Sequence, residues 1–255
     1  MATAPLTTTT PPAANPALPV DGTYNFRTTG GYAAGERTVR DGKLFRSDAL
    51  HQLTDGGRAS MAELGIATVI DLRDPSELAS SPSAVDGLGL TVEHHPIFSA
   101  GKVPNGEALT SLAAVYRTIV EKYADRLAGA VRLIADSGEH AVLVHCTAGK
   151  DRTGLVVATA LLAVGVDREQ VLADYATSGP NLSGPWAEAM LANVERYVPG
   201  PVTESTRDLI VASPAPVLAE ALDLMDAMYG SAAGLLAAHG FGDEDLARLR
   251  TVLTH

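Results

Sequence analysis

The sequence predicts an α/β fold in which a central, mainly parallel sheet is flanked by helices and followed by a C-terminal helical cap or lid. From Tyr24 onward, short runs rich in β-branched residues alternate with longer helical patterns, as in parallel sheets with helical crossovers. After residue 152 the pattern is almost entirely helical. No long polar linker interrupts the chain after residue 22, so we expect one domain over residues 22–255, with the cap around residues 168–213.

The first 21 residues are expected to form a disordered tail. They consist largely of Thr, Pro and Ala, and such a composition buries too little apolar surface to offset the entropy of ordering.

Four runs rich in Val, Ile and Leu are expected to be strands, at 44–47, 67–72, 91–97 and 141–145. A helix is expected over 54–65, because Thr54 is a good helix start and Gly65 a good stop. Apolar residues spaced three and four apart predict a long amphipathic helix over 106–137. The remaining helices are expected at 153–165, 168–176, 187–196, 215–229, 231–239 and 243–253.

Composition excludes several classes of protein. The chain has 19 Lys and Arg against 30 Asp and Glu, a net charge of −11, which argues against binding to nucleic acid. Cys146 is the single cysteine, so a disulfide, a multi-cysteine zinc site and a dithiol relay are excluded within the chain. The longest apolar run, 155–166, is too short for an integral membrane span. Because the N-terminus does not resemble a signal peptide, we expect a cytoplasmic protein, with secretion by another route left open.

The chemistry of the chain is expected in the segment that joins the strand AVLVH to the helix starting at Thr153. This segment, CTAGKDR, forms a tight loop at a helix N-terminus, where inward-pointing N–H groups and the helix dipole favour a phosphate dianion. A nucleotide-binding P-loop is excluded, because Val144 and Asp151 occupy positions where that motif needs Gly and Ser or Thr. The phosphate-binding residues are expected to be Thr147, Ala148, Gly149, Lys150, Asp151 and Arg152.

Cys146 and Arg152 bracket this loop and are the expected catalytic pair. The helix dipole and the nearby cations favour the thiolate form of Cys146, which is then a nucleophile aimed at the bound phosphorus. The planar fork of Arg152 can hold two phosphate oxygens. The loop alone therefore predicts a phosphate-ester site that needs neither a metal nor another cofactor.

The string HCTAGKDRTG at 145–154 resembles the signature of cysteine-based protein tyrosine phosphatases, in particular a branch of tyrosine and lipid phosphatases found in actinobacteria. Further segments resemble that family, namely YNFRTTGGY, GKLFRSDAL, LGIATVIDLRDPSE, VLADYATSGPN and MYGSAAGLLAAHG. The resemblance implies a tyrosine phosphatase-like fold and a two-step reaction through a phosphocysteine. It also implies supporting roles for residues near the loop: Thr153 would donate to the sulfur, His145 would order the loop, Lys150 would place a cation at the rim, and Arg46 would support the site.

The general acid is open between two carboxylates. Asp151 lies within the loop itself, while Asp71 ends the strand ATVID and should open on the same sheet edge as Cys146. Asp71 has an alternative role as an ion-pair partner of Arg46 or Arg73. Ser99 stands where relatives carry an aspartate, so that position offers no acid.

The expected substrate is a phosphorylated protein carrying phosphotyrosine, with phosphoserine, phosphothreonine or phosphoinositides as further substrates. The alternative is a small-molecule phosphatase acting on a small phosphate ester in a metabolic or biosynthetic pathway. The sequence does not predict an oligomeric state.

Overall fold

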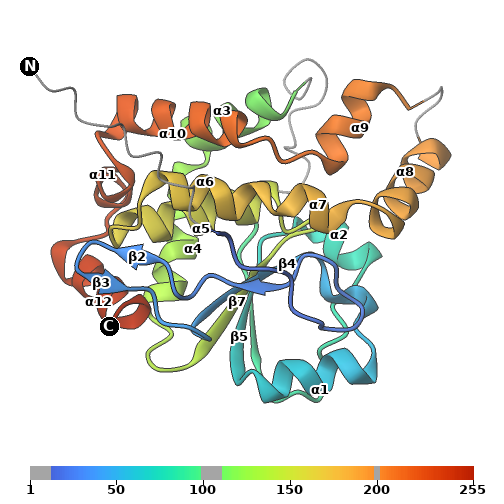
Figure 1. Ribbon diagram of the computed structural model, residues 1–255, viewed down its shortest axis with the longest axis horizontal. Coiled ribbons are helices and arrows are strands. Elements are labelled where there is room, and N and C mark those ends of the chain that lie inside the picture. The colour runs from blue at the N-terminus through green and yellow to red at the C-terminus, as the bar shows by residue number, and fades with distance from the viewer. Residues whose placement is uncertain (1–12, 99–110, 198–201) are drawn as a thin grey trace, which may run out of the picture.

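The computed structural model describes residues 13–98, 111–197 and 202–255. Its centre is a five-stranded sheet in the order β1-β4-β7-β5-β6, in which β1 is antiparallel to β4 and the other neighbours are parallel (Figure 1). The strands are β1 Arg27–Thr28, β4 Leu44–Ser47, β7 Ala141–His145, β5 Ile66–Asp71 and β6 Thr91–His94. A small ribbon pairs β2 Ala33–Ala34 with β3 Arg37–Thr38. This mostly parallel sheet confirms the predicted fold class.

Helices surround the sheet and make up the C-terminal half of the chain. Before β7 these are the 3₁₀ helix η1 Leu50–Gln52, α1 Asp55–Glu63, α2 Pro75–Ser80, α3 Leu112–Lys122 and α4 Ala124–Ala135. After β7 they are α5 Asp151–Ala163, α6 Arg168–Ala176, α7 Ser178–Leu182, α8 Pro185–Tyr197, α9 Glu204–Val211, α10 Ala215–Tyr229, α11 Ala232–Ala238 and α12 Asp243–Leu253. Among the described helices, none is long and apolar enough to cross a membrane.

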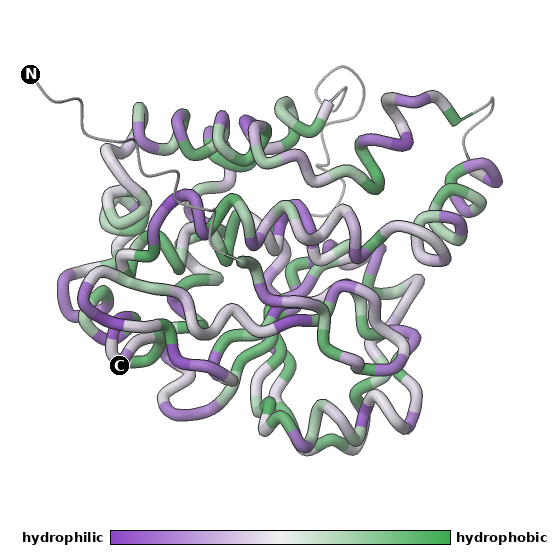
Figure 2. Tube along the Cα trace, in the orientation of Figure 1, coloured by the Kyte–Doolittle hydropathy of each residue, from purple (hydrophilic) through white to green (hydrophobic). Residues whose placement is uncertain are grey.

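Side chains on the two sheet faces enter different cores. Leu44, Ile70 and Val142 point into the larger core, which α3, α4, α5 and the C-terminal helices cover. Phe45 and Leu143, one residue along, point into a smaller core beneath α1. Figure 2 shows green hydrophobic stretches along the central strands and alternating colours along α10, as expected for a helix with one buried face.

Helix α5 begins at the phosphate loop and runs through the middle of the larger core. Most of its residues are buried, which explains the apolar run that follows the loop in the sequence. Because α5 is fixed on all sides, its N-terminus is a rigid base for the loop.

Two expectations about the elements are wrong. The helix expected over 106–137 is two helices, because the backbone leaves helical geometry at Tyr123 (φ −131°, ψ 23°) and α4 begins at the next residue; residues 106–110 lie outside the described residues. Of the tail expected over 1–21, residues 13–21 are ordered, and residues 1–12 lie outside the described residues. There the Leu18 N–H donates to the Phe26 carbonyl at 2.7 Å, and Val20 is 2 % exposed within the smaller core. These two apolar side chains dock a segment whose average composition resembles a tail.

Candidate active site

The loop between β7 and α5 is pressed against the end of β4. Ser47 is the register partner of His145, so the chain beyond Ser47 runs beside the chain beyond His145. Gly149 has a φ of +64°, and a Cβ there would lie 2.1 Å from the Ser47 carbonyl oxygen. Glycine is required at this position by both the backbone angle and the contact. The predicted loop therefore forms where the sequence places it, with Cys146 at its start and 1 % exposed.

The carbonyl groups of the loop are held on its outer side. Asn25 Nδ2 donates to the carbonyls of Ala148 at 3.0 Å and Gly149 at 3.2 Å, and Arg46 Nη2 donates to the Gly149 carbonyl at 2.8 Å. The Thr147 carbonyl accepts from the Ala49 N–H at 3.1 Å. In a trans peptide the N–H points away from the C=O, so the N–H groups that follow these carbonyls face the other side. The loop thereby gains the inward row of donors that an anion requires.

A buried carboxylate holds these donors in place. Asp174, on α6, contacts Arg46 Nη1 at 2.6 Å and Arg27 Nε at 3.2 Å, and all three residues are at most 1 % exposed. Burial alone would raise the pKa of Asp174, but the charges and hydrogen bonds of Arg27 and Arg46 outweigh it and the pKa is lowered. Arg27 Nη1 also donates to Asn25 Oδ1. We call Asn25, Arg27, Arg46 and Asp174 the buried frame.

Arg152 is held at the mouth of the loop by Glu77. Its Nη1 donates to Glu77 Oε2 at 2.5 Å and its Nη2 to Oε1 at 2.8 Å, while the guanidinium lies 5.9 Å from the centre of the Phe98 ring. Burial alone would lower the pKa of Arg152, but the Glu77 hydrogen bonds and the Cys146 charge raise it above its usual range. Glu77 occupies the outer end of the fork. Nε has no carboxylate partner among the described residues, so this N–H and the second hydrogen of the neighbouring terminal nitrogen can donate to phosphate oxygens.

Glu77 owes its position to the start of α2. Asp74 is the N-cap of that helix, and Glu77 reaches back to accept from the Asp74 N–H at 2.9 Å, forming a capping box. Thr147 Oγ1 donates to Glu77 Oε1, so the same carboxylate contacts two loop residues. Sequence reasoning missed Glu77. The string DPSE, a cap residue three positions before a glutamate, was the available signal, and it predicts the helix start rather than the contact with Arg152.

Lys150 does not place a cation at the rim, contrary to expectation. Its side chain is buried, and Nζ donates to the carbonyls of Leu209 at 2.9 Å, Ile210 at 3.3 Å and Ala212 at 2.8 Å. The last carbonyls of a helix lack intrahelical partners and carry partial negative charge, which attracts a cation. Lys150 therefore ties the C-terminal end of α9 to the loop.

Asp151 and Asp71 differ sharply in their surroundings. The Asp151 side chain is 24 % exposed, and its Oδ1 accepts from the Tyr116 hydroxyl at 2.8 Å. Asp71 ends at the expected sheet edge, paired in register with His145, but is fully buried and contacts Arg73 with both oxygens. Burial would raise the pKa of Asp71, yet the Arg73 hydrogen bonds and the nearby His145 lower it. Asp71 thus has the alternative role expected for it, as the ion-pair partner of Arg73.

All three expected supporting residues carry a buried polar atom that has no hydrogen-bond partner in the described parts of the chain. These atoms are Thr153 Oγ1, His145 Nε2 and Arg46 Nε. His145 Nδ1 lies 3.1 Å from the Cys146 carbonyl oxygen, and Nε2 lies 3.5 Å from Asp71 Oδ2. An unpaired buried hydroxyl is costly unless it has a partner in another state. Thr153 is therefore available to donate to a sulfur or phosphate that bears charge during the reaction.

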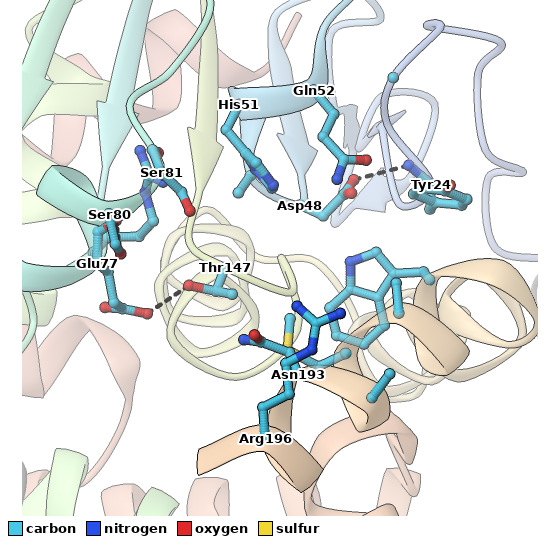
Figure 3. Close-up of a pocket in the computed structure, with 17 residues that line it drawn as sticks. Tyr24, Asp48, His51, Gln52, Glu77, Ser80, Ser81, Thr147, Asn193 and Arg196 are labelled. Atoms are coloured by element: carbon cyan, nitrogen blue, oxygen red, sulfur yellow. Dashed lines mark hydrogen bonds between the residues drawn. The ribbon is translucent and has the colours of Figure 1, made fainter.

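A cavity of about 600 Å³ opens beside Thr147 (Figure 3). Glu77 lies at one side of it, and Asn193 and Arg196 reach it from α8. Tyr24, Trp186 and Met190 add apolar surface to its lining and belong to a cluster that packs on Ala148 of the loop.

Comparison with known proteins identifies the family. A family model described as the tyrosine phosphatase family matches residues 18–255. The chain belongs to the tyrosine phosphatase family. It is 32 % identical to the triple specificity protein phosphatase PtpB of Mycobacterium tuberculosis over 271 aligned positions, covering 91 % of this chain and 97 % of that protein. A putative tyrosine-protein phosphatase of Cupriavidus necator is 34 % identical and covers 63 % of this chain and 62 % of its own length.

Among solved structures, that of P. aeruginosa TpbA in complex with pTyr is similar to this chain. The identity is 18 % and the TM-score 0.38, with 69 % of this chain and 94 % of that chain covered. The family relationship makes this tyrosine phosphatase an enzyme of the hydrolase class, and the reaction of the family is cysteine-based.

The tyrosine phosphatase site contains further residues that sequence reasoning missed. Asn25 bonds directly to the loop although it lies more than 100 residues before it in the chain. Asp174, more than 20 residues after the loop, acts on it through Arg46. Asp48 Oδ1 accepts from the N–H groups of Tyr24 at 3.0 Å and Asn25 at 2.9 Å, which fixes the N-terminal segment beside the cavity. The only signal for these contacts was weak: Tyr24, Asn25, Asp48 and Asp174 all lie in segments that resemble the family. The resemblance does not indicate which residues they contact.

Proposed function

We propose that this chain hydrolyses phosphotyrosine in proteins through a phosphocysteine at Cys146. The observation that supports the proposal most is the phosphate loop, whose carbonyls are bonded outward while Cys146 and Arg152 stand at its two ends. An inward row of N–H donors, a helix N-terminus and a guanidinium together suit the three equatorial oxygens of a transferring phosphoryl group.

The first step transfers the phosphoryl group to sulfur. The Cys146 thiolate attacks phosphorus, the bond to the ester oxygen breaks, and Asp151 gives its proton to the leaving oxygen. In the second step Asp151, now a carboxylate, takes a proton from water while the water oxygen attacks phosphorus and the thiolate leaves. The Thr153 hydroxyl, which has no hydrogen-bond partner within the described residues, donates to the departing sulfur.

The cavity favours an aryl phosphate over a small polar ester. Tyr24, Trp186 and Met190 offer an aromatic ring an apolar wall beside Thr147. A sugar phosphate would leave that wall uncovered, so we rank the small-molecule alternative second. PtpB is named for triple specificity. We accordingly include phosphoserine, phosphothreonine and phosphoinositides as slower substrates of this chain, and we propose that it acts in the cytoplasm.

We further propose that residues 168–213 act as a cap over the mouth of the site. Helix α8 supplies six residues to the cavity lining, among them Trp186 and Arg196. A substrate that fills the cavity must contact this helix, and bulky head groups require it to move.

A substrate panel tests the proposal. Phosphotyrosine and phosphoserine peptides, a short-chain phosphoinositide and a sugar phosphate are compared by kcat/KM, with Cys146→Ser as the blank and EDTA present throughout. We expect the phosphotyrosine peptide to be fastest and Cys146→Ser to be inactive while still binding that peptide. A higher kcat/KM for the sugar phosphate would favour the small-molecule alternative. Activity that EDTA removes and a divalent metal restores would contradict the cysteine mechanism.

A further inference from the structure

The hydroxyl of Tyr116 reaches out of the core to the carboxylate of Asp151. Tyr116 is on α3 and fully buried, yet its Oη donates to Asp151 Oδ1 at 2.8 Å. The same hydroxyl lies 2.6 Å from the hydroxyl of Tyr175, on α6 and 1 % exposed, and the two rings meet edge to face. Two core tyrosines and the loop carboxylate thus form a chain of hydrogen bonds that ends at the active site.

This contact distinguishes the two oxygens of Asp151. Oδ1 accepts from Tyr116, whereas Oδ2 has no hydrogen-bond partner in the described part of the chain. When the carboxyl group is protonated, the oxygen that accepts from a phenol is the carbonyl oxygen, so the acid proton resides on the other oxygen. We propose that Tyr116 is a positioning residue that holds Asp151 with its proton on Oδ2, directed away from the core and toward the leaving group. This inference rests on the proposed function, in which Asp151 is the proton donor.

The groups facing Asp151 make the phenol a donor at every working pH. Burial and the negative charge of Asp151 raise the pKa of Tyr116 well above its usual range, and burial followed by the charge of Asp151 also raises that of Tyr175. Both hydroxyls therefore stay protonated. The other charged groups near Asp151 are Lys150, whose Nζ lies 3.5 Å from Oδ1, and Arg152.

Removing the hydroxyl changes the proton donor without removing it. Tyr116→Phe removes the hydrogen bond to Oδ1, so either oxygen of Asp151 can then carry the proton. The carboxyl group also loses its fixed orientation, which matters most when the leaving oxygen needs a proton to depart. A ring that only fills the core would have neither effect, since Phe preserves its shape and apolar contacts.

The experiment compares Tyr116→Phe with wild type on an alkyl phosphate, which has a poor leaving group, and on an activated aryl phosphate. We expect kcat to fall about tenfold on the alkyl phosphate and less than about twofold on the activated one. Tyr175→Phe, which keeps the Tyr116 contact with Asp151, is the matched control and should change kcat less. Thermal unfolding establishes that each variant is folded.

Two further variants, Asp151→Asn and Asp151→Asn combined with Tyr116→Phe, distinguish the role of Asp151 as proton donor from the positioning role of Tyr116. If Asp151→Asn shows the leaving-group dependence, Tyr116→Phe should add no further loss to it, because both act on the same proton. Equal losses of kcat for Tyr116→Phe on both substrates would overturn the positioning role while leaving Asp151 as the donor. If Asp151→Asn itself shows no leaving-group dependence, the proposed donor fails, whatever the result for Tyr116.

Discussion

The phosphate loop has two sides that are built in different ways. The buried frame behind it, Asn25, Arg27, Arg46 and Asp174, is at most 1 % exposed and bonds to the loop carbonyls. At the rim, the side chains of Arg152, Asp151 and Glu77 are 13 %, 24 % and 28 % exposed. The frame fixes the shape of the loop through charges that water cannot reach. The rim keeps accessible the groups that must meet substrate and exchange protons.

Stability should therefore depend mainly on the buried frame, and activity mainly on the rim. A buried charge whose partner is removed costs several kcal/mol, whereas a partly exposed ion pair contributes little to folding. Substitutions in the buried frame are therefore expected to lower the free energy of unfolding. Substitutions at the rim are expected to lower kcat/KM while the protein stays folded.

Asp174→Asn should have the largest effect on stability. It leaves Arg27 and Arg46 buried without a carboxylate, so we expect the free energy of unfolding to fall by about 3 kcal/mol. Because the pKa of Asp174 is lowered, its contribution is present above the unfolded-state value of about 4 and is lost as the pH falls through the folded-state value. Urea denaturation should therefore show a gap between variant and wild type that is full at pH 7 and narrows in acid. A gap that does not depend on pH would contradict the ion-pair account.

Arg152→Lys should reduce kcat/KM about a hundredfold, because an ammonium group cannot hold two phosphate oxygens in the fork geometry. Its free energy of unfolding should change by less than about 1 kcal/mol. Steady-state kinetics on a phosphotyrosine peptide measures kcat/KM, and urea denaturation measures the free energy of unfolding. A loss below about tenfold would mean that Arg152 is peripheral to the reaction.

Glu77→Gln tests whether the rim carboxylate positions Arg152. Glutamine keeps the size of the side chain but loses the charge, so we expect kcat/KM to fall about tenfold with little change in stability. Glu121→Gln, which removes an exposed ion pair with Arg117, is the matched control and should behave like wild type. A Glu77→Gln variant that binds inorganic phosphate more tightly and turns over faster would show that Glu77 competes with substrate instead.

Lys150→Met should have the smallest effect on the fold, which we expect to be greatest in the cap. Without the cation on the carbonyls of Leu209, Ile210 and Ala212, we expect faster hydrogen exchange in α9 and unchanged exchange in β7. Mass spectrometry of the deuterated peptides measures both. Unchanged exchange in α9 would mean that other contacts fix this helix to the loop.

Local patterns in the sequence predicted the four parallel strands of the sheet, the loop and its two end residues, because each depends on neighbours in the chain; strand β1 was not predicted. The strand AVLVH followed by a glycine-containing turn and an apolar helix determines where Cys146 and Arg152 lie. The contact of Arg152 with Glu77 was not predictable in this way, since the two residues are 75 positions apart and meet through the fold.

Two expectations failed where the local pattern carried no signal. The apolar spacing runs on through Tyr123, so nothing in the periodicity indicates the break between α3 and α4. From its residue type and its place in the loop, Lys150 was expected to place a cation at the rim. Instead, its ammonium group donates to the C-terminal carbonyls of α9. For Lys150, an element about 60 residues away in the chain determined where the side chain lies.

Trapping the reaction intermediate tests whether the reaction passes through a phosphocysteine at Cys146. The enzyme is mixed with a phosphotyrosine peptide, quenched in acid within milliseconds, digested and examined by mass spectrometry. We expect wild type to carry a phosphoryl group on the peptide that contains Cys146, and Cys146→Ser to carry none. A phosphoryl group on any other residue, or steady turnover with no phosphorylated enzyme at any time, would contradict it.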